Sequence, residues 1–195
     1  MDHHVSKYLF KNSTLENPIY VTALEQHVKP SRKEVVEAIQ KNIETNVLGN
    51  VYANSTGWDL HQKSDIIKSV CYTMKLAVHE ILCELMSGTD GVETATFDYD
   101  PLNCWGVIYK ENDATKVHWH YPSTMSQVYY VQVESNSSPL IFTDIDLEIT
   151  PESGMLITFP PWLRHTVPPL EKNDQRVVIS VNWLMTKGGQ PETPN

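Results

Sequence analysis

Residues 176–183 have the sequence Arg-Val-Val-Ile-Ser-Val-Asn-Trp, a pattern of period two. Successive side chains of a β-strand point to opposite faces of a sheet. One face of this segment is entirely apolar: Val177, Ile179, Val181 and Trp183. The other face carries a cation, Arg176, and two polar residues, Ser180 and Asn182, together with Val178. We expect the apolar face to lie against helices and the more polar face to line the interior of a sandwich or barrel.

The whole sequence after Gly91 has the same texture, with short alternating runs separated by Pro, Gly, Asn and Ser. These runs predict strands at 92–99, 104–110, 115–120, 126–134, 139–143, 147–150, 154–159, 165–167 and 176–185. No helical pattern interrupts them, which is typical of antiparallel sheets. The pattern favours a mainly β fold with N-terminal helices, an antiparallel sandwich or barrel for which a jelly roll fits best.

Two amphipathic helices are expected before this β region. Ser31 and Glu34 form a capping box, and the apolar spacing after them predicts a helix over 31–46. A longer apolar stripe predicts a second helix over 64–86, with Gly88 placed to end it. We expect both helices to cover the outer surface of the sheet.

Length and composition describe one domain over residues 1–195. We expect a helical N-terminal portion over 1–90 that packs on the sheet, a jelly-roll core over 91–185 and a flexible tail over 186–195. Acidic residues outnumber basic ones 24 to 15, giving a formal charge of −9, which argues against nucleic acid as the primary ligand. No apolar run approaches the roughly 18 residues of a membrane span, so we expect a cytoplasmic protein with no membrane association. The sequence leaves a homodimer open.

Three histidines carry the chemistry. His118 and His120 are separated by Trp119 at the end of an expected strand, so both should project from the same face. His165, from a neighbouring strand, could add a third imidazole. Three nitrogen ligands on one face of a first-row metal leave the opposite positions open for a small chelating molecule and O₂. Such an open site indicates catalysis rather than a structural role.

Four motifs in order resemble a known family: His118-Trp-His-Tyr-Pro122, Ser126-Gln-Val-Tyr-Tyr-Val131, Gly154-Met-Leu-Ile-Thr-Phe-Pro-Pro-Trp-Leu-Arg-His165 and Arg176-Val-Val-Ile-Ser-Val-Asn182. Over roughly 92–185 the chain is similar to the small bacterial and phage 2-oxoglutarate/Fe(II) oxygenases, which are prolyl-hydroxylase-like proteins. A weaker signature upstream is Gly57-Trp-Asp-Leu60.

The resemblance implies a double-stranded β-helix that binds Fe(II), 2-oxoglutarate as cosubstrate, and O₂. It makes His118 and His165 iron ligands and Arg176 the anchor of the far carboxylate of 2-oxoglutarate. Tyr130 resembles a tyrosine that helps bind this carboxylate, and Ser180 is a weaker candidate for the same pocket. An arginine suits this role because its planar fork pairs with both carboxylate oxygens, as lysine cannot.

One position departs from most oxygenases of this kind. They have His-x-Asp or His-x-Glu where this chain has His118-Trp119-His120, although the small family it most resembles shares His-x-His. Three neutral imidazoles would leave an Fe(II) site one positive charge higher than two imidazoles and a carboxylate. Metal affinity and redox behaviour should differ accordingly.

The function implied is an oxygenase, of the hydroxylase kind, which couples decarboxylation of 2-oxoglutarate to succinate with oxidation of a C–H bond. Its substrate, a small molecule or a protein side chain, is not specified by the sequence. One alternative is another cupin-type metalloenzyme, a three-His dioxygenase or an isomerase. Against it, Thr124 and Met125 stand where a cupin would have its glutamate. The other alternative is a non-enzymatic jelly roll, a binding or virion-associated module with structural histidines.

Overall fold

Two antiparallel sheets face each other in the computed structural model, which describes residues 7–9, 16–44, 49–86, 97–134, 137–171 and 175–187. The larger sheet has eight strands, in the spatial order β1 (Lys7–Leu9), β2 (Tyr20–Ala23), β11 (Met155–Phe159), β8 (Met125–Val133), β13 (Arg176–Lys187), β6 (Phe97–Tyr109), β5 (Asn54–Thr56) and β3 (Ile43–Glu44). The smaller sheet has five, in the order β10 (Leu147–Ile149), β9 (Leu140–Phe142), β12 (His165–Val167), β7 (Ala114–His118) and β4 (Val51–Tyr52). This is the predicted jelly-roll arrangement.

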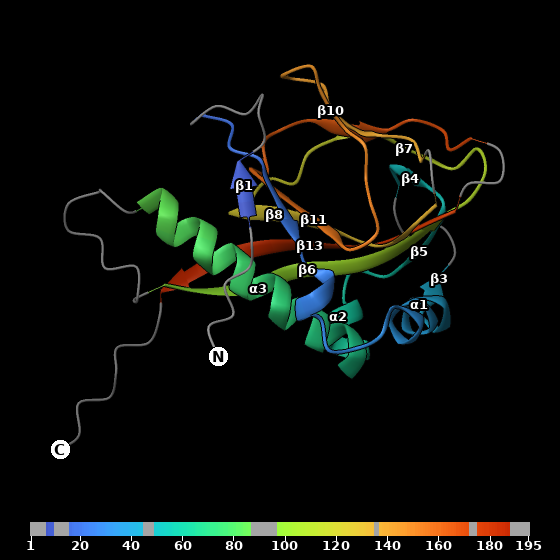
Figure 1. Ribbon diagram of the computed structural model, residues 1–195, viewed down its shortest axis with the longest axis horizontal. Coiled ribbons are helices and arrows are strands. Elements are labelled where there is room, and N and C mark those ends of the chain that lie inside the picture. The colour runs from blue at the N-terminus through green and yellow to red at the C-terminus, as the bar shows by residue number, and fades with distance from the viewer. Residues whose placement is uncertain are drawn as a thin grey trace.

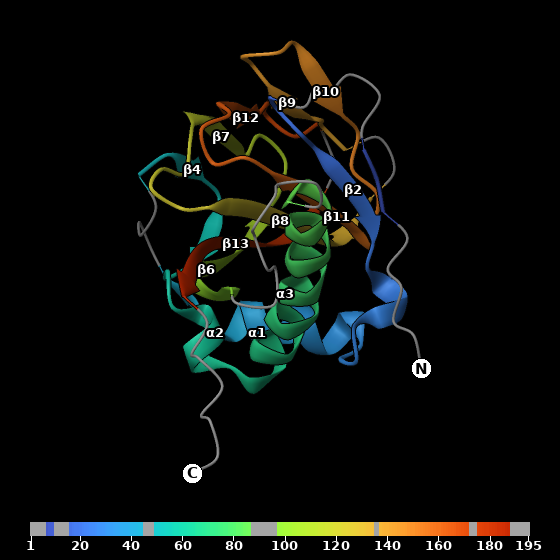
Figure 2. The ribbon, with the colours of Figure 1, turned by 90° about the vertical axis from the view of Figure 1, so that its left-hand side faces the viewer.

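The helices cover the face of the large sheet that is turned away from the small sheet. They are the short 3₁₀ helix η1 (Glu25–His27), α1 (Arg32–Lys41), α2 (Leu60–Lys63) and α3 (Asp65–Met86). In Figure 1 they lie below the large sheet and the small sheet lies above it; Figure 2 shows the same order from the side. Of the helices described, none is both long and apolar enough to cross a membrane.

Each face of the large sheet has its own apolar core. Between the sheet and the helices, buried residues of α1 and α3, such as Ile39 and Met74, pack with the apolar face of β13. Between the two sheets, Val178 of β13 packs with residues such as Phe142 and Phe159. The alternation of β13 therefore has the outcome expected from the sequence, with helices on one face and the interior on the other.

Gly106 lets α1 approach β6 closely. A Cβ atom at this position would lie 2.8 Å from Cγ2 of Ile39, which is fully buried. A side chain here would have to displace the helix that covers the sheet.

The capping box is present at the start of α1, where the Ser31 side chain accepts from the Glu34 backbone and the Glu34 side chain accepts from the Ser31 backbone. The prediction that this helix runs to residue 46 is wrong, because α1 ends at Lys41. The next residues, Ile43 and Glu44, pair with β5 as a strand instead. The second helix agrees with its predicted range, whereas Gly88 and the predicted strand residues 92–96 lie outside the described residues.

The two strands predicted at 92–99 and 104–110 form one strand, β6, in the described part of the chain. Pro101 falls inside it, next to a β-bulge at Leu102, which is skipped where the register with Asn182 and Trp183 of β13 shifts. A bulge accommodates a proline, which has no N–H for the ladder. Strands β1 to β5 were not predicted from the sequence, although β2 joins β11 in the large sheet and β4 joins β7 in the small one.

Candidate active site

His118, His120 and His165 come together at the open end of the space between the sheets. His118 ends β7 and His165 begins β12, and the two residues are paired across these neighbouring strands. One ring nitrogen from each of the three histidines lies within 4.8 Å of the others. The Nε2 atoms of His120 and His165 are 3.2 Å apart. This cluster is the only group of at least three His, Cys, Asp or Glu side chains with metal-binding spacing among the described residues.

Backbone carbonyls orient two of the rings. Nδ1 of His118 lies 2.8 Å from the carbonyl oxygen of Lys116, and Nδ1 of His165 lies 3.0 Å from that of Leu163. A carbonyl oxygen only accepts, so each Nδ1 carries the proton and donates it. Both Nε2 atoms are then left with a free lone pair, the form of imidazole that binds a metal.

Burial keeps the cluster uncharged. Desolvation lowers the pKa of His118 and, to about 3, that of His120. It lowers the pKa of His165, which is 3% exposed, well below its usual value. For His120 and His165 the proximity of the other rings adds to this effect, because a protonated imidazole would repel the next. All three side chains are therefore neutral bases at pH 7.

His120 lies beyond the strand, contrary to the predicted strand at 115–120, because β7 ends at His118. Its backbone is fixed in the following turn instead. Its N–H donates to the carbonyl of Pro161 at 2.8 Å, and its carbonyl accepts from the hydroxyl of Ser123 at 2.7 Å. Strand alternation therefore does not explain why His118 and His120 lie close together, because only His118 belongs to β7. The turn after β7 directs His120 to the cluster instead.

Asn182 is a residue of the site that the sequence did not single out. Its Nδ2 lies 3.2 Å from Nδ1 of His120. The same side chain accepts from the Ser126 hydroxyl at 2.7 Å and donates to Oδ1 of Asn103 at 2.8 Å. The sequence feature that could have indicated this role is the position of Asn182 on β13, on the same face as Arg176 and Ser180.

A cavity of about 300 Å³ extends from the cluster into the space between the sheets. All six residues predicted for the site line it: His118, His120, Tyr130, His165, Arg176 and Ser180. Indoles line it as well, those of Trp58, Trp105 and Trp119. The structure therefore brings together every predicted site residue around one space.

Arg176 is the unusual member of this set. It is 1% exposed, and its Nη1 donates to the carbonyl of Ser138 at 2.8 Å. Nε and Nη2 are buried and have no hydrogen-bond partner among the residues that the structure describes. The guanidinium lies against the rings of Tyr109 and Tyr130, with distances of 5.1 and 5.9 Å to the ring centroids. No carboxylate of the described residues forms an ion pair with it.

Tyr130 is also fully buried, and desolvation raises its pKa to about 12. Its hydroxyl is therefore protonated and able to donate a hydrogen bond at any physiological pH. Ser180 is 7% exposed and follows Arg176 on the same face of β13, two positions beyond Val178. A cation and two hydroxyls thus lie in the cavity with the histidines.

Comparisons with known proteins give one kind of match. No protein-family model matches the chain, and no curated protein matches its sequence. Many solved structures do match.

A viral collagen prolyl hydroxylase from Paramecium bursaria Chlorella virus-1, in its 2OG complex, has a TM-score of 0.55 at 11% identity; 97% of this chain and 98% of that chain are covered. A Pseudomonas putida prolyl-4-hydroxylase has a TM-score of 0.53 at 13% identity, and 97% of this chain and 95% of that chain are covered. A prolyl hydroxylase from Trichoplax adhaerens, in complex with a peptide fragment of the hypoxia inducible factor oxygen degradation domain, has a TM-score of 0.57 at 14% identity. Here 85% of this chain and 83% of that chain are covered. The fold predicted from the sequence is confirmed: the chain has a double-stranded β-helix similar to the fold of these three hydroxylases.

Proposed function

We propose that this protein is an Fe(II)- and 2-oxoglutarate-dependent oxygenase of the hydroxylase kind. The observation that carries the proposal is Arg176, a buried cation whose Nε and Nη2 have no hydrogen-bond partner among the described residues, in the same cavity as three neutral histidines. A buried charge without a partner is strongly unfavourable. An anionic ligand that also reaches the histidines would relieve this, and a dicarboxylate with a 2-oxo group has that composition.

His118, His120 and His165 would hold the metal. Their burial leaves three unprotonated imidazoles, and their ring nitrogens lie within 4.8 Å of one another, so the donor set suits a first-row divalent ion. When bound, Fe(II) would supply, with O₂, the oxidative decarboxylation of 2-oxoglutarate to succinate and CO₂ together with oxidation of a substrate C–H bond. The protein side chains position and shield the reactants rather than act as acids or bases.

Arg176 would bind the far carboxylate of 2-oxoglutarate. Its free Nε and Nη2 lie on adjacent corners of the guanidinium, which allows two parallel hydrogen bonds to one carboxylate. Tyr130 can donate a third bond from its protonated hydroxyl, and Ser180 is placed to add another. The two tyrosine rings against the guanidinium hold it in place without neutralising it.

The donor set itself favours a second candidate, a three-His cupin-type dioxygenase that uses no 2-oxoglutarate. No carboxylate belongs to the cluster in the described part of the chain, and three-histidine centres suit that alternative. Such an enzyme, however, has no use for a buried arginine without a partner. We therefore favour the 2-oxoglutarate-dependent reaction, with a small molecule or a protein side chain as the substrate, and we place the protein in the cytoplasm.

The test is production of succinate from 2-oxoglutarate by the iron-loaded protein in air, without added substrate. Charge-assisted hydrogen bonds contribute about 1.5–3 kcal/mol, so Arg176→Ala should raise the KM for 2-oxoglutarate by roughly ten- to a hundredfold. Arg176→Lys should recover part of this loss, because a point charge cannot form two parallel bonds. Iron affinity should stay nearly unchanged in both variants.

Arg32→Ala is the matched control, because Arg32 is exposed and pairs with Glu25 far from the cavity lining. It should leave the KM unaltered. If the iron-loaded parent makes no succinate, or makes as much as Arg176→Ala does, 2-oxoglutarate is not the cosubstrate and the three-His dioxygenase becomes the better account.

A further inference from the structure

Trp58 lies where the cavity opens to solvent. It lines the cavity and is 43% exposed, although it is a large apolar side chain. Its ring meets Trp105 edge-on, with centroids 4.8 Å apart and an interplanar angle of 66°. Trp105 is buried and lies 5.6 Å from the ring of His120. Two indoles therefore connect the histidine cluster to the surface, and the outer one keeps a face uncovered by protein.

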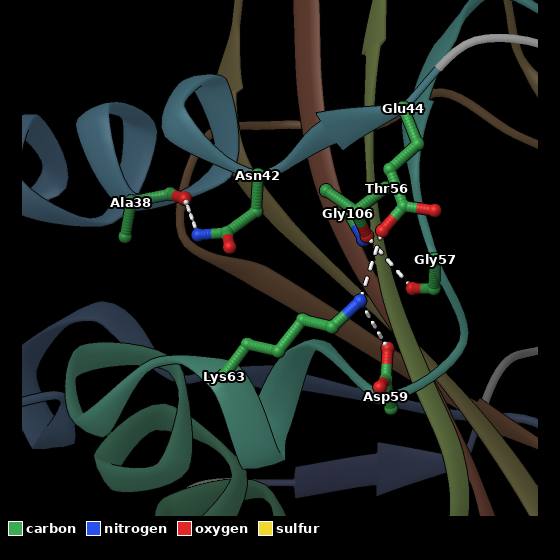
Figure 3. A network of polar contacts seen from close by, with 8 residues as sticks. All are labelled: Ala38, Asn42, Glu44, Thr56, Gly57, Asp59, Lys63 and Gly106. Atoms are coloured by element: carbon green, nitrogen blue, oxygen red, sulfur yellow. Dashed lines mark hydrogen bonds and ion pairs between the residues drawn. The ribbon is translucent and has the colours of Figure 1, made fainter.

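A cluster of three charged side chains holds the segment that carries Trp58. Nζ of Lys63 lies 2.9 Å from Oε1 of Glu44 and 2.8 Å from Oδ1 of Asp59 (Figure 3). We refer to Glu44, Asp59 and Lys63 as the Lys63 clamp. Because these groups are 40–47% exposed, the clamp should add little to global stability. Its consequence is geometric, since it ties the residue next to Trp58 to strand β3.

The backbone on both sides of Trp58 is fixed as well. Thr56 donates from its hydroxyl to the carbonyl of Gly57 at 3.0 Å and accepts from the Gly106 N–H at 3.0 Å (Figure 3). The carbonyl of Trp58 accepts from the N–H of Cys104 at 2.7 Å. Each residue from 56 to 59 is thus held by a hydrogen bond or an ion pair. Packing of the Trp58 indole alone would not require these contacts.

The charged groups of the clamp lie beside Trp58 but do not line the cavity. Among the described residues that line it, there is no aspartate, glutamate or lysine, and the only permanent cation is the buried Arg176. A third indole, Trp119, lines the cavity and is 58% exposed. A charged substrate group entering between these indoles would lose water without gaining a partner of opposite charge. The lining therefore favours an uncharged group with an apolar face.

We infer that Trp58 determines specificity by receiving an uncharged apolar face of the substrate beside the histidine cluster, and that the Lys63 clamp positions its indole. This deepens the proposed oxygenase function and rests on it for the identity of the reacting site. Trp58 would touch substrate, whereas Lys63 acts through Trp58 as a positioning residue.

Three probes that share a benzyl group test the charge preference: benzyl alcohol, the cation benzylamine and the anion phenylacetate. Each is titrated by ligand-observed NMR against protein loaded with Mn(II), a redox-inert substitute for iron, and 2-oxoglutarate. The parent should bind benzyl alcohol at least about threefold more tightly than either charged probe. Aromatic contacts contribute about 0.5–1.5 kcal/mol, so Trp58→Ala should weaken the binding of benzyl alcohol roughly two- to tenfold. Trp58→Phe should weaken this binding less. Equal affinity in parent and Trp58→Ala, or stronger binding of a charged probe, overturns the inference.

The clamp is tested with Lys63→Met, which keeps most of the aliphatic stem and removes the charge. The control is Lys33→Met, since Lys33 makes only an exposed pair with Glu37 at 3.8 Å. Near-ultraviolet circular dichroism should contain a contribution from the Trp58–Trp105 pair that Trp58→Phe removes. Lys63→Met should diminish this contribution to the spectrum and weaken the binding of benzyl alcohol, whereas Lys33→Met should change neither. An unchanged spectrum and affinity in Lys63→Met overturn the positioning role.

Failure of the proposed function is distinguishable from failure of this inference. Binding of Mn(II) and of 2-oxoglutarate is measured separately on each protein. If the parent binds neither, the oxygenase proposal fails, and the same titration on metal-free protein still decides whether Trp58 receives the uncharged probe.

Discussion

The two faces of β13 put neighbouring residues of one strand to different uses. On the helix side, Val177, Ile179, Val181 and Trp183 are buried in an apolar core. The polar atom of this face is paired as well, because Nε1 of Trp183 donates to Gln127 at 2.8 Å and Gln127 donates to Thr158 at 2.9 Å. On the inner side, Arg176 is buried, and its Nε and Nη2 have no partner in the described part of the chain.

This difference separates burial for stability from burial for binding. A folded protein rarely leaves a buried donor unpaired, since each such group costs about 1–3 kcal/mol. On the helix side the unpaired buried atoms are single polar atoms of Thr22, His61 and Glu80, away from β13, whereas the inner face of β13 breaks the rule at a permanent charge. Substitutions on the two faces should therefore affect different measurements, free energy of unfolding on one and ligand binding on the other.

The largest effect is expected at the histidine end of the inner face. Replacing His118, His120 or His165 by Ala should weaken Fe(II) binding by about a hundredfold or more, because two ligands hold a labile divalent ion poorly. The fold should stay intact, as judged by circular dichroism, and Fe(II) affinity is measured by anaerobic titration.

The control for these variants is His27→Ala, since His27 lies in η1, outside the cluster. It should bind iron as the parent does. Parental affinity in His120→Ala would show that His120 is not a ligand, and the third position would then belong to another group.

On the helix face, Ile179→Ala should lower the free energy of unfolding by about 2–5 kcal/mol, because Ile179 is fully buried beneath the helices. Its side chain points away from the cavity, so affinity for 2-oxoglutarate should be the same as in the parent. Urea denaturation and 2-oxoglutarate titration of the folded variant check the two statements. A large loss of cosubstrate affinity without a loss of stability would contradict the division between the faces.

Asn182→Ala should have a smaller effect, because Asn182 contacts a candidate ligand rather than the metal. Loss of a group that orients a metal-binding histidine typically reduces metal affinity about ten- to a hundredfold. Fe(II) titration should show that reduction with the unfolding free energy changed by less than in Ile179→Ala. Affinity equal to the parent's would mean that the turn after β7 alone positions His120.

The strand pattern and the placement of the six candidate residues around one cavity were largely predictable from sequence, for different reasons. The alternation of β13 and the apolar stripe of α3 are local, so period alone predicted them. The six candidate site residues were predicted from the order of the sequence motifs, because proteins with the same fold keep such motifs in the same order. Parity could not place His120, because β7 ends two residues before it and the turn that directs it depends on a contact with Pro161.

What the sequence could not indicate depends on pairing across long distances. Strand β3 has two residues and exists only because β5 pairs with it, so helix α1 ends earlier than its own periodicity predicts. The Lys63 clamp joins Glu44 to a residue 19 positions later, and its contact with the Trp58 segment follows from that pairing. Asn182 was on the predicted inner face, but its contact with His120, 62 positions earlier, was not predictable from spacing.

The most direct measurement of the central claim is an anaerobic titration of the protein with Fe(II) in the presence and absence of 2-oxoglutarate, followed by visible absorption. An Fe(II)–2-oxoacid chelate has a weak charge-transfer band in the visible range. The account predicts that the band appears only when both are present, is lost in His165→Ala, and in Arg176→Ala requires roughly ten- to a hundredfold more 2-oxoglutarate. Tight Fe(II) binding with no band at saturating 2-oxoglutarate would contradict it.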